Sequence, residues 1–243
     1  MNAYASSRAA RWAMLPLLVT ALLACTGGDL SNAQPARQLA TAAPAETAAG
    51  VQGLGKETAE GAITDTIHLR DLGYSRGSAD APVVVYEFAD FGCPFCGMFA
   101  RSTYPELHKE FVETGKVRWT YIPVTFGFPG GAEGAVAAEC AAEQQKFWEM
   151  HDLLFQKQSE WKNERDRERL LPGYAEQIGL DVGAFLSCYR ASGGRERLVL
   201  NNHAADALHL RATPSFLING RLVEGALPIE QFRQILTMLG GER

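Results

Sequence analysis

The sequence has no excess of positive charge. Among its 243 residues, 23 Lys and Arg stand against 28 Asp and Glu, which gives a net charge of −5. This argues against a nucleic-acid-binding surface, which needs clustered basic residues. No internal repeat is visible, and 47% hydrophobic with 21% charged residues is ordinary for a soluble globular protein. The length suits one domain with an insertion or two small domains.

The sequence also lacks the ligand spacing of a structural zinc site. It has five cysteines and five histidines, but a single Cys-x-x-Cys pair, Cys93 and Cys96. His203 and His209 lie six positions apart, which does not match the spacing of zinc-binding histidines. We therefore expect no metal site and interpret the histidines as structural or surface residues.

The N-terminal region is predicted to be an export signal. An apolar run over residues 12–24 follows two arginines, is too short to be a convincing membrane span, and ends in small residues. Leu22-Leu23-Ala24-Cys25 resembles a bacterial lipobox. We expect residues 1–24 to be removed, Cys25 to be lipidated, and the protein to be anchored to a membrane in the periplasm or cell envelope. The alternative is an ordinary signal peptide cleaved a few residues later.

A low-complexity segment follows. Residues 25–62 are mainly Ala, Thr, Gln, Pro and Gly, with few large apolar side chains. Such a segment cannot bury enough surface to offset its ordering entropy. We expect a flexible tether that lets a folded domain of residues 63–243 stand off the membrane.

The first part of that domain reads as alternating strands and helices. Thr66–Arg70 alternates like a short strand, and Val83–Phe88 is a β-branched and aromatic run typical of a strand buried on both faces. A helical stretch follows the cysteine pair to about Glu113, and Pro105 within it predicts a kink. Val117–Ile122 is predicted as the next strand.

The second part changes to helices and then returns to strands. Residues 130–210 are predicted to form a helical block. Ser215–Ile218 and Arg221–Val223 flank Asn219-Gly220, a strong hairpin signal, and Pro228 begins a final amphipathic helix. This order is similar to the thioredoxin-like plan. The predicted fold class is α/β, with a central mixed sheet flanked by helices and an inserted helical subdomain at about 130–210.

The segment Cys93-Pro94-Phe95-Cys96 carries the predicted chemistry. It lies after a strand and at the start of a helix, where unpaired N–H groups and the helix dipole favour the Cys93 thiolate. Cys96 is expected to be more buried and to resolve a mixed disulfide. By itself the motif is also compatible with half of a zinc site or a structural disulfide. The flanking strand and helix favour a redox pair.

Several segments together resemble the DsbA-like branch of the thioredoxin superfamily. These are Cys93-Pro94-Phe95-Cys96 after its strand, Thr213-Pro214 before Ser215-Phe216, and Phe147–Phe155 in the helical block. The resemblance implies that Cys93 attacks, Cys96 resolves, and Pro214 is a cis-proline facing the disulfide, leaving the backbone of Thr213 free to pair with a substrate peptide. A trans proline that opens a strand is the alternative. No cofactor beyond the disulfide is expected.

Two further residues qualify this reading. Glu87 lies six residues before Cys93 on the preceding strand, where DsbA-like proteins have a Glu, and it is expected to accept the proton when Cys96 attacks. The alternative is a solvent-facing strand Glu. DsbA has His where this sequence has Phe95. Because Phe95 cannot supply an imidazolium, Cys93 is expected to be less acidic and the disulfide less oxidising than in DsbA.

Cys140 and Cys188 form the remaining pair. Both lie in the predicted helical block, where some DsbA-like proteins carry a second disulfide. We expect a disulfide that acts as a structural staple in an oxidising compartment. The alternatives are two buried free thiols and a second redox-active pair.

The sequence thus predicts a monomeric thiol-disulfide oxidoreductase. Its substrates would be unfolded or partly folded exported proteins, held in a groove lined by Phe91, Phe95, Thr213 and Pro214, and a membrane redox partner would recycle its disulfide. A dithiol oxidase is expected. The alternatives are a reductase for a dedicated client and a non-enzymatic chaperone or metal-binding module that uses the same groove.

Overall fold

The computed structural model describes residues 52–53 and 68–241. The predicted signal peptide, Cys25 and most of the predicted tether lie outside the described residues, as does the predicted start of the domain at residue 63. Within the described residues no helix is long and apolar enough to cross a membrane.

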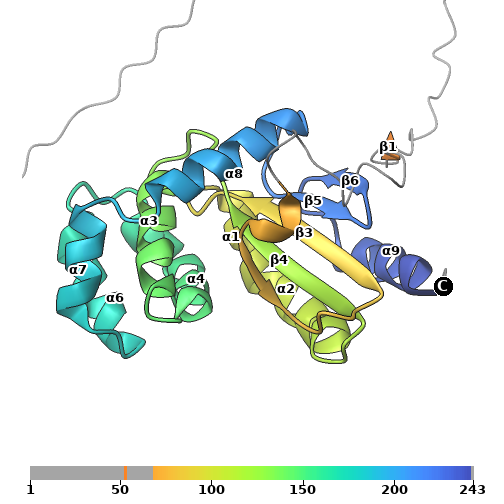
Figure 1. Cartoon of the computed structure of the whole chain (residues 1–243), viewed down its shortest axis with the longest axis horizontal. Helices are drawn as coiled ribbons and strands as arrows, with labels where there is room; N and C mark the ends of the chain where they lie inside the picture. The colour runs from red at the N-terminus through yellow and green to blue at the C-terminus, as the bar shows by residue number, and fades with distance from the viewer. Residues whose placement is uncertain (1–51, 54–67, 242–243) are drawn as a thin grey trace, which may run out of the picture. The chain divides into compact units, whose positions relative to one another are not determined.

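A mixed sheet forms the centre of the domain (Figure 1). Its strand order is β1-β6-β5-β3-β4-β2. β3 (Val83–Ala89) and β4 (Val117–Pro123) are parallel neighbours, and every other pairing is antiparallel. The other strands are β1 (Gln52–Gly53), β2 (Tyr74–Arg76), β5 (Ser215–Ile218) and β6 (Arg221–Glu224). The central β3 is hydrogen-bonded on both sides and contributes side chains to the core on both faces of the sheet, which explains its nearly continuous apolar sequence.

One face of the sheet is covered by α1 (Pro94–Ser102), α2 (Tyr104–Leu107), the short π-helix η2 (His108–Val112) and α9 (Ile229–Gly241). Alternate residues of β3, Val83 and Val85, point into this layer, where Phe99, Trp119 and Phe232 are fully buried. The period of two along β3 places Glu87 on the same face. A carboxyl group is thereby brought beneath α1.

The opposite face is covered by α8 (Arg195–Ala207) and the 3-10 turn η1 (Leu69–Asp71). Phe88 points to this side and packs with Ile122, Leu217 and Ala204. Helices therefore lie on both faces of the sheet, as the predicted fold class requires.

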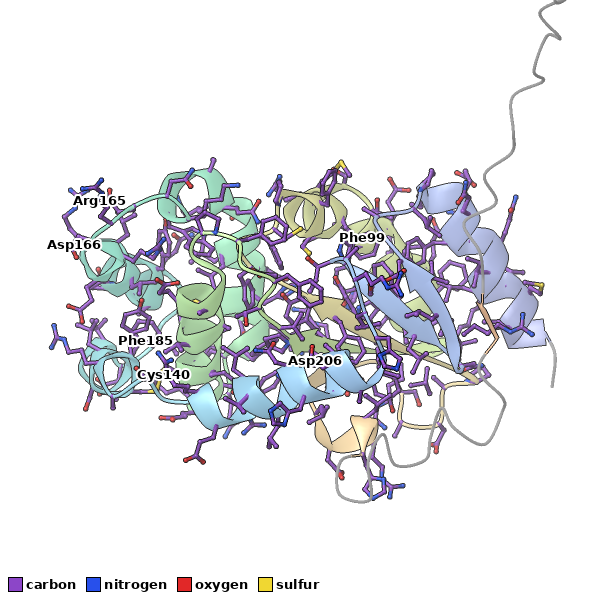
Figure 2. All side chains as sticks on the ribbon, turned by 90° about the horizontal axis from the view of Figure 1, so that it is seen from above. Phe99, Cys140, Arg165, Asp166, Phe185 and Asp206 are labelled. Carbon is purple, nitrogen blue, oxygen red and sulfur yellow. A yellow bond between two sulfur atoms is a disulfide. The ribbon has the colours of Figure 1, made fainter. Side chains whose placement is uncertain are left out.

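The inserted helices pack in a core that also takes in Ala89 of β3 and Tyr121 of β4. They are α3 (Gly131–Ala142), α4 (Phe147–Gln156), α5 (Gln158–Trp161), the 3-10 turn η3 (Arg167–Arg169), α6 (Leu171–Gln177) and α7 (Val182–Arg190), and with α8 they occupy the predicted 130–210 block. Phe185 is buried in this core, whereas Phe99 is buried against the sheet, and Figure 2 shows the two residues well apart. The α/β architecture with an inserted helical subdomain is confirmed.

Two local predictions need correction, and one strand was not predicted. Leu69 and Arg70, predicted to end a strand, lie in the 3-10 turn η1. The strand β2 was not predicted, because its three residues carry no alternation and become a strand by pairing with β4. The helix around Pro105 does not merely kink: α1 ends at Ser102 and α2 begins at Tyr104, since Pro105 has no N–H to donate within a continuous helix.

Candidate active site

The cysteine pair lies where β3 gives way to α1. Cys93 is the N-cap residue of α1, with φ −69° and ψ 124°, and its N–H donates to the carbonyl oxygen of Asp90 at 3.0 Å. Pro94 occupies the first helical position, where a missing N–H costs no hydrogen bond. The Cys93 side chain therefore lies beside the unpaired N–H groups at the positive end of the helix.

The two thiols have opposite electrostatic environments. Both cysteines are free and buried. Hydrogen bonding from the Cys96 thiol lowers the pKa of Cys93 to about 6, helped by the backbone N–H groups of Phe95 and Cys96 and opposed by burial. Burial raises the pKa of Cys96 well above its usual value. One sulfur is thus suited to be a thiolate at neutral pH, and the other is held as a thiol.

The peptide bond between Thr213 and Pro214 is cis. The Thr213 carbonyl accepts a hydrogen bond from the Cys93 thiol at 3.3 Å, so the loop before β5 lies directly against the reactive sulfur. Phe95, in contrast, is 59% exposed at the start of α1. The structure brings Thr213 and Cys93 into contact and leaves Phe95 accessible beside the pair.

Phe91 does not lie where the sequence analysis placed it. It was expected to line a substrate groove, but it is fully buried and packs against Tyr121, Phe155 and His151 at ring-centroid distances of 5.3, 5.0 and 5.8 Å. The turn after β3 directs this side chain into the core of the helical subdomain. Phe91 therefore supports the turn from inside and is not available to a substrate.

Glu87 is buried beneath α1. It is 3% exposed, it pairs in register with Tyr121 and Phe216 on the neighbouring strands, and its Oε2 accepts a hydrogen bond from Trp119 Nε1 at 2.8 Å. Burial raises the pKa of Glu87 to about 8, and the Trp119 bond opposes this shift. The alternative of a solvent-facing Glu is therefore wrong. At neutral pH this carboxyl is largely protonated and able to donate a proton, and after it has done so the carboxylate can accept one.

Asp90 and Gln158 were not predicted as site residues, and both hold the turn before Cys93. Asp90 is fully buried; its Oδ1 accepts from the Gly92 N–H at 2.8 Å and its Oδ2 accepts from the Phe126 N–H at 2.7 Å. Gln158, on α5, donates to the carbonyl oxygens of Phe91 and Cys93. The short spacing from Asp90 to Cys93 is a weak turn signal, whereas nothing local in the sequence relates Gln158 to the cysteines.

Cys140 and Cys188 form a disulfide, with their Cα atoms 5.7 Å apart, that joins α3 to α7. Both cysteines lie in the helical subdomain. Cys140 and Phe185, labelled in Figure 2, belong to the same buried cluster. The free-thiol alternative does not hold in this structure.

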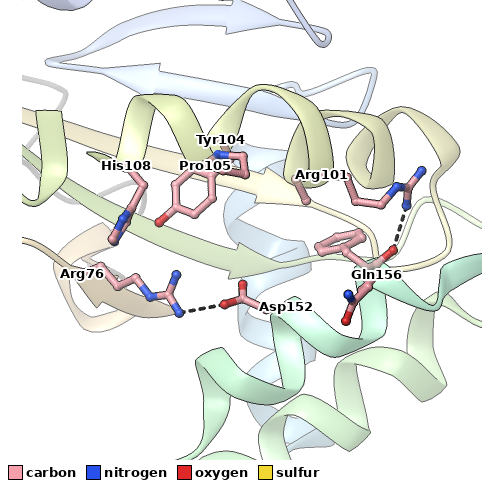
Figure 3. Close-up of a pocket in the computed structure, with 9 residues that line it drawn as sticks. Arg76, Arg101, Tyr104, Pro105, His108, Asp152 and Gln156 are labelled. Carbon is pink, nitrogen blue, oxygen red and sulfur yellow. Dashed lines mark hydrogen bonds and ion pairs between the residues drawn. The ribbon is translucent and has the colours of Figure 1, made fainter. Parts of the chain in front are cut away.

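A groove of about 560 Å³ lies between α1–α2 and α4 (Figure 3). Arg76 and Asp152 form an ion pair of 3.0 Å across it, and the Arg101 guanidinium donates to the carbonyl oxygen of Phe155 at 2.7 Å. The buried Tyr104 hydroxyl has no protein hydrogen-bond partner. Neither cysteine of the redox pair lines this groove. Among the described residues no group of three His, Cys, Asp or Glu side chains is placed to hold a metal ion.

Comparison with known proteins relates this site to a family. A family model described as thioredoxin matches residues 71–237. The chain is 36% identical over 212 residues to the Na(+)/H(+) antiporter NhaA 3 of Salinispora tropica, covering 86% of this chain. The match covers 30% of the antiporter, so the chain spans about a third of the length of such relatives. It is 25% identical over 172 residues to disulfide bond formation protein D of Bacillus subtilis, covering 66% of this chain and 73% of that protein.

Solved structures share the fold. BdbD from Bacillus subtilis, in its oxidised form, superposes with a TM-score of 0.63 at 23% identity and covers 68% of this chain and 91% of its own. DsbA from Chlamydia trachomatis superposes with a TM-score of 0.61 at 22% identity, with coverages of 69% and 91%. At these identities the likeness is one of fold.

Proposed function

The chain belongs to the thioredoxin family and has the fold of its DsbA-like members, and on that premise we propose that it is a protein-disulfide oxidoreductase. Cys93 is the exchanging sulfur and Cys96 the resolving one. The observation that carries the proposal is the place of Cys93 at the N-cap of α1, with its sulfur 3.3 Å from the Thr213 carbonyl oxygen, and the pKa values of the two thiols are displaced in opposite directions there. A structural disulfide has no use for such an asymmetry, whereas thiol-disulfide exchange requires a good nucleophile and leaving group at one sulfur.

The proposed reaction oxidises a substrate dithiol. A substrate thiolate attacks Sγ of Cys93 in the disulfide form; the new bond joins the two, the Cys93–Cys96 bond breaks, and Cys96 takes the electron pair. A second substrate thiolate then attacks the first substrate sulfur, and Cys93 leaves as a thiolate. The substrate gains a disulfide and the pair gains two electrons. A low pKa at Cys93 makes this departure favourable.

Protons move at the buried side of the pair. Cys96, with its raised pKa, takes up a proton as it leaves, and Glu87 supplies that proton because its raised pKa keeps it protonated at neutral pH. In the reverse direction Glu87 accepts the proton as Cys96 attacks. Glu87 thus serves both directions of exchange.

We propose that the Cys93–Cys96 disulfide oxidises substrate dithiols and that the dithiol form does not serve as a reductant. Phe95 supplies no positive charge, yet hydrogen bonds still lower the pKa of Cys93 to about 6. Stabilising the thiolate stabilises the reduced pair, which makes the disulfide more oxidising. A reductase for a dedicated client is the second candidate, favoured by the absence of an imidazole between the cysteines.

Substrates and location follow from the same proposal. Unfolded or partly folded exported proteins would lie along exposed Phe95 and the Thr213–Pro214 loop, and a membrane redox partner would recycle the disulfide. The name of the Bacillus subtilis relative, disulfide bond formation protein D, supports this role. Export and lipid anchoring at Cys25 rest on the sequence pattern. The protein is proposed to act as a monomer without metal or cofactor, and antiporter activity is not carried over from relatives of which the chain covers 30%.

The reduction potential of the Cys93–Cys96 pair tests the proposal. A potential well above about −200 mV identifies an oxidase, whereas one near about −270 mV would transfer the assignment to the reductase. Cys96→Ser is the control, since it should trap mixed disulfides with substrate at Cys93. Complete absence of exchange with a dithiol substrate would contradict the enzyme and favour a binding module.

A further inference from the structure

The helical subdomain sends one side chain into the turn that precedes the redox pair. Gln158 is the first residue of α5 and is 4% exposed. Its Nε2 donates hydrogen bonds of 2.8 Å to the carbonyl oxygen of Phe91 and of 2.8 Å to that of Cys93. These two carbonyls flank the Gly92-Cys93 segment. One carboxamide therefore binds both ends of the turn. Gln158 lies 67 positions after Phe91 and 65 positions after Cys93 in the sequence.

From this geometry we propose that Gln158 is a positioning residue for thiol-disulfide exchange, which holds the backbone of Cys93 against the head of α1. This inference rests on the function proposed above and assigns to the insertion a part in the chemistry. Gln158 acts on neither reacting sulfur directly in the proposed role; it acts through the Phe91–Gly92 and Cys93–Pro94 peptide groups.

The chemistry of the side chain suits this task. A carboxamide nitrogen carries two hydrogens and can serve two acceptors at once. The Cys93 carbonyl also accepts the first helical hydrogen bond, from the Gly97 N–H at 3.1 Å. The Gln158 bond is therefore added to the helix cap without displacing it. Both carbonyls lie in a buried region where an unmet acceptor is costly.

Gly97 makes the close approach of α5 possible. A Cβ atom at this position would lie 2.2 Å from Gln158 Oε1 and 2.8 Å from Arg101 Nη1. Gly97 follows directly after Cys96 and is buried against α5. Any side chain there would displace the carboxamide from the turn. The glycine after the Cys-Pro-Phe-Cys motif is thus explained by the position of Gln158.

Gln158 is itself held in place by its surroundings. At the other end of α5, Trp161 Nε1 donates to the carbonyl oxygen of Leu154 at 2.7 Å, and its fully buried ring lies against the backbone at Gly134. On the α4 side, Arg101 of α1 donates to the carbonyl oxygen of Phe155 at 2.7 Å. The carboxamide therefore meets the turn from a rigid support, as a positioning group must.

The expected consequence concerns the Cys93 thiolate. Its low pKa depends on hydrogen bonds from the Cys96 thiol and from backbone N–H groups at the start of α1. Such bonds weaken steeply as their angles depart from linearity. If the turn loosens, these donors no longer converge on the sulfur, and the thiolate loses stabilisation while the fold remains.

Gln158→Met tests the proposal, because Met has similar length but no donor. Gln156→Met is the matched control, since Gln156 is an exposed residue two positions earlier on α4. The measurement is the pH midpoint for alkylation of Cys93 by iodoacetamide in the dithiol protein, followed by the reduction potential. We expect the midpoint of Gln158→Met to rise by about half a unit to one unit, and its potential to fall. The control should match the wild type.

A lower melting temperature with an unchanged midpoint and potential would make Gln158 a structural residue only and overturn the proposal. If Gln158→Met does not fold, Gln158→Asn and Gln156→Asn replace the pair, because Asn keeps the carboxamide but is one methylene too short to reach both carbonyls. Equal midpoints in those two variants would also overturn it. A wild-type midpoint near about 8.5, the value of an ordinary cysteine, would instead contradict the proposed function itself.

Discussion

At the residue scale, neighbouring polar groups of this site differ mainly in what surrounds them. Glu87 has a single hydrogen bond, from Trp119, and its pKa is raised by burial. Asp90 is also buried and its pKa is also raised, but two backbone N–H groups bind its two oxygens. The first arrangement leaves a carboxyl able to exchange its proton. The second holds a turn in place.

Replacement of Glu87 by Gln should stabilise the protein increasingly as pH rises. The pKa of Glu87 is raised from 4.5 to about 8 on folding, so the wild type loses stability as pH rises through this window. The variant lacks this loss, and the difference in the free energy of unfolding should grow by up to about 1.4 kcal/mol per pH unit. Urea unfolding of the disulfide form at several pH values measures it.

The same variant should exchange disulfides more slowly at neutral pH, because Gln cannot pass a proton to or from Cys96. The Gln carbonyl can still accept the Trp119 hydrogen bond, so the fold is preserved. A stability difference that does not change with pH would show that Glu87 is ionised in the folded protein.

At the scale of elements, the helical subdomain has a covalent link of its own. The Cys140–Cys188 disulfide links α3 to α7 across a sequence separation of 48 residues. A covalent link of this kind restricts the unfolded chain. Since both sulfurs belong to helices of the subdomain, we expect the disulfide to stabilise the subdomain and not to act as a second redox-active pair.

The double variant Cys140→Ser/Cys188→Ser should therefore be less stable than the wild type but keep its thiol-disulfide exchange activity. The loop-closure relation predicts a loss of about 4 kcal/mol for a loop of this length. Urea unfolding measures the loss, and the Cys93–Cys96 reduction potential should stay at its wild-type value. A changed potential would mean that the second disulfide takes part in the redox function.

At the scale of the whole molecule, stability is linked to the redox state of the cysteine pair. On folding, the pKa of Cys93 falls from 9.0 to about 6, whereas that of Cys96 rises. A lowered pKa adds stability that is lost as pH falls through the folded value. This contribution exists only when the pair is reduced, because a disulfide does not titrate.

We expect the free energy of unfolding of the dithiol form, relative to that of the disulfide form, to increase between about pH 6 and pH 9. The limiting slope is about 1.4 kcal/mol per pH unit. Parallel denaturation of the two forms measures it, and contributions from Glu87 cancel because both forms contain it. Cys93→Ala/Cys96→Ala is the control and should show no redox-dependent term. A difference that decreases with pH would contradict the low pKa of Cys93.

The sequence by itself determined the features that depend on short stretches of chain. The Cys93–Cys96 pair, the buried strand before it and the hairpin at Asn219-Gly220 each have local signatures, because residue spacing and turn chemistry act over a few positions. The sequence also indicated the order of elements and hence the fold class. The prediction that Cys93 is the attacking sulfur followed from its place at a helix start.

Only the tertiary structure decided which side chains meet. Phe91 was expected at a groove and is buried, β2 exists because β4 offers it an edge, and Gln158 reaches the turn from more than sixty residues away. The burial of Glu87, and with it the raised pKa, likewise depends on α1 and on Trp119. Contacts of this kind arise from packing between distant segments, and packing leaves no periodic or local pattern in the sequence.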